Sequence, residues 1–206
     1  MVAACLGCSW AGNVIVVDDG SDDATAEKAA AAGAHVVRLE GSQGSKADAM
    51  HAGVEASTAD SILFVDADCL GLTSAHLDDL CRPFAEARAV MSLGFFDYGV
   101  LNPLVHRLPP ITGERVLPRW VFDAVPADKK EGWKIEIAIN EVVAERRLPT
   151  VARTMRGVTH RTKREKLGRV EGYVATWRMF REVVGMVNHV RWRWYWFYLR
   201  NLTLER

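Results

Sequence analysis

The chain has 206 residues, of which 49% are hydrophobic and 25% charged, and these ordinary globular values argue against a disordered chain. The length suits one sizeable α/β domain, or one domain with a helical extension, and argues against two full domains. Its zero net charge hides an asymmetry, because residues 1–100 hold 5 Lys and Arg against 15 Asp and Glu while residues 101–206 hold 21 against 11. The basic half suits phosphate, an anionic acceptor or a lipid surface, or it forms solvated helix faces.

The cysteines and the lack of a long apolar run bear on the compartment. Cys5, Cys8, Cys69 and Cys81 do not form the disulfide framework of a small secreted protein, and the first eight residues are too short for a signal peptide. No apolar run reaches the roughly 18 residues needed to span a bilayer. We therefore expect reduced thiols and a cytoplasmic location.

The first predicted strand covers residues 14–17 and ends in Asp18-Asp19-Gly20-Ser21, after a segment that looks like the end of a helix. Gly20 permits a tight turn, and Asp22 or Asp23 can cap a helix that runs to Ala32. Gly33 then ends this helix, and residues 34–39 form the next predicted strand.

A Gly-rich loop at residues 40–46 leads into a predicted helix over residues 47–56. Backbone amides at such a helix start can bind phosphate, and Lys46 adds a positive charge. A generic surface loop is the alternative.

The most informative stretch is the predicted strand over residues 62–65, which ends in Asp66-Ala67-Asp68. Its continuous β-branched and aromatic side chains are typical of a strand buried on both faces of a mostly parallel sheet, and such strands carry function at their carboxyl ends. Two carboxylates one residue apart suit a hard divalent cation. A strand-end turn, in which Asp binds its own backbone, is the alternative.

Helices and strands alternate through the rest of the chain, as in an α/β protein. An amphipathic helix is predicted over residues 73–87 and a strand over residues 90–96. Prolines interrupt residues 98–131, where a short helix is expected at 117–124. A helix that runs to Val143, a strand over residues 148–155 and a helix from Val170 to the end complete the pattern.

Three of these motifs, Asp18-Asp19-Gly20-Ser21, Gly44-Ser45-Lys46 and Asp66-Ala67-Asp68, stand in the order found in one family. They resemble the signatures of nucleotide-diphospho-sugar glycosyltransferases of the GT-A fold, family 2 and its relatives. The resemblance covers roughly residues 3–170, and implies a Rossmann-like, mostly parallel sheet flanked by helices. The family's opening strand, of the type Ile-Pro-x-x-Asn-Glu, has no counterpart here, so we expect a GT-A domain whose first strand is missing.

On the donor side, the resemblance implies that Asp19 contacts the nucleotide while Asp18 forms the turn. It further implies that Asp66 and Asp68 bind Mg²⁺ or Mn²⁺, with Asp66 also facing the nucleotide sugar. His160, which follows Gly-Val in a basic loop, matches a third metal ligand of many GT-A enzymes, including glucosyl-3-phosphoglycerate synthases. The cations expected to assist at the diphosphate are Lys46, Arg161 and Arg164.

On the acceptor side, Thr112-Gly113-Glu114-Arg115 resembles the family's acceptor loop, so Glu114 and Arg115 are the acceptor-binding candidates. Pairing of the Arg with Glu114 or with a neighbouring carboxylate is the alternative. Glu136 stands in a Gly-aromatic-x-x-Glu element, whose acid lies near the acceptor in the family. It would be the catalytic general base if the enzyme inverts configuration, and an acceptor ligand if it retains. An exposed first-turn Glu is the alternative.

We predict a glycosyltransferase domain over residues 1–169 and a helical tail over residues 170–206. The aromatic and Arg side chains at 191–200 suit a peripheral membrane contact at the inner face of the membrane, or a helix that packs on the domain or at a homodimer contact. The predicted function is metal-dependent transfer of a hexose from a nucleotide diphosphate sugar to an unidentified acceptor, with a lipid phosphate or a small phosphorylated compound as candidates. A nucleotidyltransferase and a catalytically inactive binding module are the alternatives, and no nucleic-acid partner is expected.

Overall fold

The computed structural model describes residues 1–39, 45–106, 112–130, 132, 134–160, 196 and 200–205. Its main sheet has the strand order β3-β6-β5-β7-β9. In that order the strands are Ser61–Phe64, Arg115–Pro118, Met91–Phe96, Thr150–Met155 and Leu202–Glu205. β6 pairs antiparallel with both β3 and β5, whereas β5, β7 and β9 pair in parallel, so β6 is the one reversed strand of this sheet.

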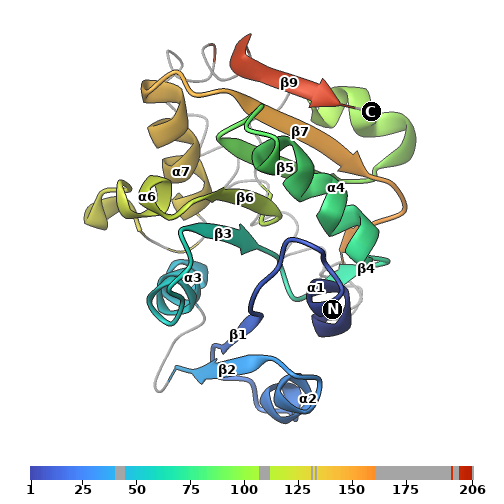
Figure 1. Cartoon of the computed structure of the whole chain (residues 1–206), viewed down its shortest axis with the longest axis vertical. Helices are drawn as coiled ribbons and strands as arrows, with labels where there is room; N and C mark the ends of the chain where they lie inside the picture. The colour runs from blue at the N-terminus through green and yellow to red at the C-terminus, as the bar shows by residue number, and fades with distance from the viewer. Residues whose placement is uncertain are drawn as a thin grey trace, which may run out of the picture.

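Two helical layers cover the two faces of this sheet (Figure 1). On one face, α3 (Lys46–Glu55), α6 (Arg119–Asp123) and α7 (Lys134–Glu145) pack in one hydrophobic cluster with β5, with Leu117 of β6 and with Ala152 of β7. On the other face, α4 (Ser74–Ala85) packs on β5 and β6, α1 (Val2–Leu6) packs on α4, and Cys8, Leu77 and Cys81 cluster with Val116 of β6. The predicted α/β class and the mostly parallel sheet are confirmed.

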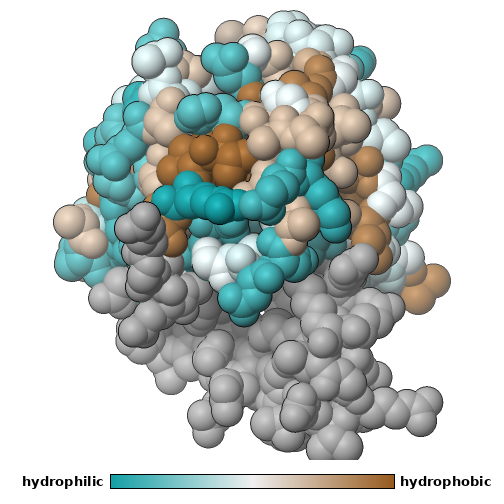
Figure 2. Space-filling model, turned by 90° about the horizontal axis from the view of Figure 1, so that it is seen from below, coloured by the Kyte–Doolittle hydropathy of each residue, from teal (hydrophilic) through white to brown (hydrophobic). Residues whose placement is uncertain are grey.

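A second, smaller sheet pairs β1 (Ile15–Asp18) with β2 (His35–Arg38) in parallel. α2 (Thr25–Ala31) packs against both strands, and α3 packs against β1. Among the described strands, β1 pairs with β2 alone. Figure 2, which views the molecule from this end, shows a cluster of hydrophobic residues bordered by hydrophilic ones. In β1, the side chains of Ile15, Val16 and Val17 are half-buried rather than buried.

A third pair joins β4 (Cys69–Leu70) to β8 (Thr159–His160) in antiparallel orientation, with Cys69 directly opposite His160. The remaining short elements are α5 (Asn102–Val105) and the 3₁₀ turns Gly99–Leu101 and Ala127–Lys129. Within the described part of the chain, no helix has the length and apolar character needed to cross a bilayer.

Three details of the predicted elements are wrong. The short helix expected at 117–124 begins only at Arg119, because residues 115–118 form β6 and insert between β3 and β5. Residues 202–205, expected to continue a helical tail, form β9 against β7. The N-cap of α2 is Ala24, and Asp23 instead accepts a hydrogen bond from the Thr25 amide at 2.9 Å.

Candidate active site

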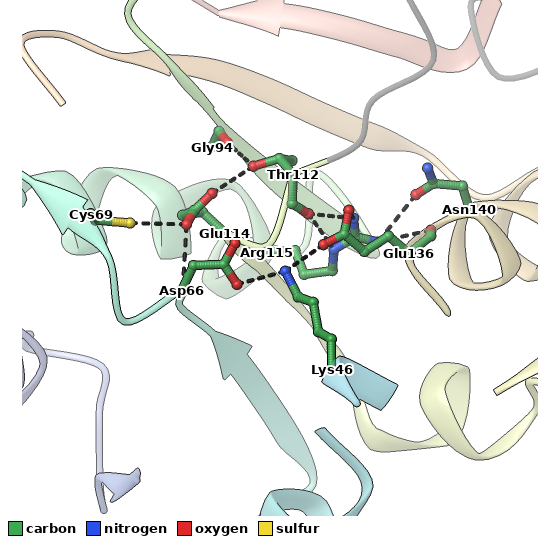
Figure 3. Close-up of polar contacts among 9 residues, drawn as sticks. All are labelled: Lys46, Asp66, Cys69, Gly94, Thr112, Glu114, Arg115, Glu136 and Asn140. Carbon is green, nitrogen blue, oxygen red and sulfur yellow. Dashed lines mark hydrogen bonds and ion pairs between the residues drawn. The ribbon is translucent and has the colours of Figure 1, made fainter. Parts of the chain in front are cut away.

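Three predicted motifs meet at the carboxyl end of β3 (Figure 3). Asp66 follows β3, Lys46 begins α3, and Glu136 lies in the first turn of α7. The Lys46 Nζ lies 2.6 Å from Asp66 Oδ1 and 2.6 Å from Glu136 Oε1. One ammonium group therefore joins two carboxylates that are 70 residues apart in the sequence.

The start of α3 fixes where Lys46 stands. Ser45 is the N-cap, and its side chain accepts a hydrogen bond from the Asp48 amide, as a helix N-terminus requires. Burial opposes the charge on Lys46, but the carboxylates of Glu136 and Asp66 outweigh it and raise the pKa of the amine. The Lys46 side chain and that of Asp66 keep about a third of their surface exposed, so the pair faces solvent on one side.

The loop before β6 packs against Asp66. Glu114 is fully buried, and its Oε1 accepts hydrogen bonds from the Asp66 amide at 3.3 Å and from Cys69 Sγ at 3.0 Å. Its Oε2 lies 2.7 Å from Thr112 Oγ1, which is also 2.5 Å from the Gly94 carbonyl oxygen. Glu114 thus holds both ends of the Asp66–Cys69 segment.

The hydrogen bonds of Thr112 bear on whether the Glu114 carboxyl carries a proton. A hydroxyl has one proton to donate, and Thr112 has an acceptor on each side. If Thr112 donates to Gly94, the contact to Glu114 is completed by a proton on the Glu114 carboxyl. Burial, followed by the nearby Asp66 carboxylate, raises the pKa of Glu114, in keeping with that neutral form. The pKa of the Cys69 thiol is also raised by burial, which keeps the thiol a hydrogen-bond donor.

Arg115 is fully buried and turned toward α7. It donates from Nε to the Thr112 carbonyl oxygen at 3.1 Å and from Nη1 to the Glu136 carbonyl oxygen at 3.2 Å and to Asn140 Oδ1 at 3.3 Å. Its Nη2 lies 3.9 Å from Glu136 Oε2. The alternative of pairing with a neighbouring carboxylate therefore holds. Because Glu114 and Arg115 are both buried with internal partners, the expected direct contact of either with an acceptor does not fit this geometry.

Glu136 is itself 3% exposed, so the alternative of an exposed first-turn Glu is wrong. Its two carboxylate oxygens face Lys46 on one side and Arg115 on the other. The start of α7 adds a third favourable charge interaction, since the N-terminus of a helix is partially positive. Glu136 is thereby fixed beside the Asp66–Lys46 pair.

Asp18 and Asp19, which are neighbours at the turn after β1, have different hydrogen-bond partners. Asp18 is buried and accepts a hydrogen bond from the Ser21 amide at 3.0 Å, which makes it the turn-former. Hydrogen bonds from Ser21 lower the pKa of Asp18. Asp19 Oδ1, by contrast, is a buried oxygen with no hydrogen-bond partner among the described residues. A buried polar atom in this state is a place where a ligand group can bind.

The remaining donor-side candidates are only partly described. Asp68 is half-buried between Asp66 and β4. The β4–β8 pairing brings the backbone of His160 opposite Cys69, one residue beyond Asp68. Arg161 and Arg164 lie outside the described residues, as does the 191–195 stretch. Within the described side chains, no group of three or more His, Cys, Asp or Glu is already gathered as a metal site.

Two glycines make these approaches possible. A Cβ on Gly113 would lie 2.2 Å from Asp66 Oδ1, so only glycine leaves room for that carboxylate. A Cβ on Gly71 would lie 2.6 Å from the Gly157 carbonyl oxygen, at the point where the chain enters β8, and Gly71 has a φ of +78°. The sequence at 71 and 113 thus clears the space in which Asp66 lies and β4 pairs with β8.

Comparison with known proteins agrees with this architecture. The model of the family "Glycosyl transferase family 2" matches residues 13–183, which is most of the chain. The chain belongs to glycosyl transferase family 2. A comparison with curated protein sequences finds no match for this family 2 chain.

Solved structures share the fold of this family 2 chain. One is glucosyl-3-phosphoglycerate synthase from Mycobacterium tuberculosis in complex with Mn²⁺, uridine-diphosphate-glucose and phosphoglyceric acid, with a TM-score of 0.65 at 22% identity. The match covers 78% of this chain and 66% of the synthase, so this chain spans just under two thirds of that protein's length. The same synthase with Mg²⁺ and uridine diphosphate also gives a TM-score of 0.65. A mycobacterial protein matches with a TM-score of 0.55 at 28% identity, over 66% of this chain and 52% of its own.

Sequence reasoning missed three polar residues of the family 2 site. The sequence motifs give Thr112 no role of its own, identify Cys69 only as a reduced thiol and do not include Asn140. Asn140 has a readable signal, because it lies four residues after Glu136 and therefore on the same face of the helix. Nothing local in the sequence marks Thr112 or Cys69 as partners of Glu114.

Proposed function

We propose that this family 2 chain transfers a hexose from a nucleotide diphosphate sugar to a small phosphorylated acceptor. The observation that carries the proposal is the meeting of Lys46, Asp66 and Glu136 at one site, where Lys46 and Asp66 keep about a third of their surface exposed. Each comes from a different family-like motif, and together they provide a cation for phosphate, a carboxylate for a metal and a carboxylate able to accept a proton. The synthase with the same fold was crystallised with uridine-diphosphate-glucose and phosphoglyceric acid, which supports this choice of donor and acceptor class.

We assign Asp66, Asp68 and His160 to a divalent cation, Mg²⁺ or Mn²⁺. Carboxylate oxygens suit both ions, and the space that Gly113 leaves for the Asp66 carboxylate supports the fit. When bound, such a cation supplies positive charge to the diphosphate as it leaves the sugar. Lys46 already lies against Asp66 and is assigned to the same phosphates. Arg161 and Arg164, which follow His160 in the sequence, are assigned there as well.

Glu136 is assigned to the acceptor, as its general base if the transfer inverts configuration and as an acceptor ligand if it retains configuration. As the base it takes the proton of the acceptor hydroxyl while the hydroxyl oxygen bonds to the anomeric carbon and the bond from that carbon to the diphosphate breaks. Arg115 holds the residue in place from the buried side and itself donates a hydrogen bond to Asn140. Asp19, with its unpartnered buried oxygen, is assigned to the nucleoside.

Calorimetric titration with uridine-diphosphate-glucose, with and without Mn²⁺, tests this function. We expect binding that needs Mn²⁺ and that Asp68→Asn weakens at least about 10-fold, as loss of a metal ligand should. The matched control is Asp60→Asn, which changes an exposed aspartate just before the same strand. Binding that ignores the metal, or that both variants weaken equally, would contradict the proposal.

A further inference from the structure

Glu114 is fully buried next to the segment that carries the proposed metal ligands Asp66 and Asp68. Its carboxyl binds the amide that begins the Asp66–Cys69 segment and the thiol that ends it (Figure 3). Its other oxygen is anchored through Thr112 to the backbone of β5 at Gly94, and the Gly94 amide donates to the Glu114 carbonyl at 2.8 Å. The residue is thus fixed to the buried part of β5 on one side and to the Asp66–Cys69 segment on the other.

The same loop supports each of the three proposed ligands. Gly113 lies against the Asp66 carboxylate with no room for a side chain between them. Asp68 lies within the span that Glu114 holds at both ends. Cys69, which donates to Glu114, is the backbone partner of His160 in the β4–β8 pair. A displacement of Glu114 would therefore move all three together.

We propose that Glu114 is a positioning residue, which sets the separation of Asp66, Asp68 and the β4–β8 pair and thereby the affinity for the divalent cation. This inference rests on the proposed function, because it assigns the cation to the same three residues. It replaces the acceptor contact expected from the sequence, because Glu114 has no exposed surface, whereas Glu136 pairs with the partly exposed Lys46, through which an acceptor could reach it.

The hydrogen bonds define which substitutions should preserve the role. Glutamine has the same length, and its amide oxygen can accept from the Asp66 amide and Cys69 while its NH₂ donates to Thr112. Alanine removes all three contacts and leaves a void beside buried polar groups. A positioning role therefore predicts that Glu114→Gln keeps what Glu114→Ala loses.

The test is the dissociation constant for Mn²⁺ alone, measured by paramagnetic resonance of the free ion, on the full chain and its variants. We expect Glu114→Ala to raise this constant about 10- to 100-fold, the range seen when a group supporting a metal ligand is removed, and Glu114→Gln to change it less than about 3-fold. An unchanged constant in Glu114→Ala would overturn the inference. Failure of the unmodified chain to bind Mn²⁺ would overturn the proposed function and this inference together, a pattern distinct from the first.

Two further variants separate positioning from loss of stability. Val143→Ala removes a buried side chain of α7 that makes no polar contact with the site, and should lower the melting temperature without changing the Mn²⁺ constant. Cys69→Ala removes one donor to Glu114 and should weaken Mn²⁺ in the same direction by a smaller factor, so it tests the inference even if Glu114→Ala does not fold. Equal effects of Val143→Ala and Glu114→Ala on the Mn²⁺ constant would count against the inference.

Discussion

β1 and β5 have the same kind of sequence and lie in different surroundings. β1 is a run of three apolar residues that ends in Asp18, and β5 is apolar except for Ser92, so both sequences favour strands that bury both faces. In β5 five of the six residues are buried between two paired neighbours, whereas in β1 three of the four residues are half-buried beside the one strand that pairs with it among the described residues. An apolar run therefore indicates how much surface a strand can bury, and the neighbouring elements determine how much of that surface is buried.

The division between the two sheets is also a division of roles. The residues of the Lys46–Asp66–Glu136 cluster, and those that contact them, come from the five-stranded sheet and from the helices packed on it. Asp19, assigned to the nucleoside, directly follows β1. We expect the cluster to hold its geometry under conditions that already loosen the β1–β2 pair, since locally less buried regions open at lower free energy.

The largest expected difference concerns one arginine in each sheet. Arg115→Met should lower the free energy of unfolding by about 3–5 kcal/mol, because it removes the guanidinium that faces the buried Glu136 carboxylate. Arg38→Met in β2 should change it little, because Arg38 is 59% exposed where it pairs with Asp18 and Glu27. Urea denaturation of both variants measures the two effects. Equal losses would show that the two sheets do not differ in this way.

A smaller difference is expected for apolar side chains. Leu93→Ala in β5 removes a fully buried side chain and should cost about 3 kcal/mol, within the range for large-to-small changes in a core. Val16→Ala in β1 removes less volume from a half-buried position and should cost about 1 kcal/mol. Hydrogen exchange should show the same order, with faster exchange of β1 amides. Comparable protection of the two strands would contradict the comparison.

The fold was largely predictable because periodicity and turn residues are local signals. The strands over residues 62–65, 90–96 and 148–155 and the helices between them needed no long-range information. β6 was missed because its four residues include a buried arginine and a proline, which no local rule assigns to the interior of a sheet. β9 was missed because its pairing with β7 joins residues about 50 positions apart.

The site was predictable only as a set of motifs. Asp66, Lys46 and Glu136 could be named from the sequence because each stands in a family-like signature. The direction in which Glu114 and Arg115 point could not be named, since it depends on contacts with Asp66 and Asn140, which lie 48 and 25 residues away in the chain. Residues of one short motif thus turned out to support opposite sides of the site.

Two glycines, one beside the proposed metal site and one before β1, allow the two regions to be compared by metal binding. Gly113→Ala should weaken Mn²⁺ binding about 10-fold or more, because the new Cβ and the Asp66 carboxylate cannot occupy the same space. Gly12→Ala, before β1, should leave binding unchanged, since nothing lies within 4 Å of the added atom. Paramagnetic resonance of Mn²⁺ compares them directly. Unchanged affinity in Gly113→Ala would mean that the Asp66 carboxylate does not take part in metal binding.

The smallest expected effect is a pH dependence at the end of β5. Asp97 accepts hydrogen bonds from the Asn102 side chain and from the amides of Gly157 and Gly99, which lower the pKa of its carboxyl to about 2. A carboxyl whose pKa is depressed by folding stabilises the folded state above its unfolded pKa, near 4, and loses that contribution as the pH falls toward 2. Asp97→Asn should therefore be less stable than the unmodified chain at pH 7, and the difference should shrink below pH 4. Urea denaturation at pH 7, 4 and 3 measures it. A difference that is the same at all three pH values would assign the effect to lost hydrogen bonds alone and not to the ionised carboxylate.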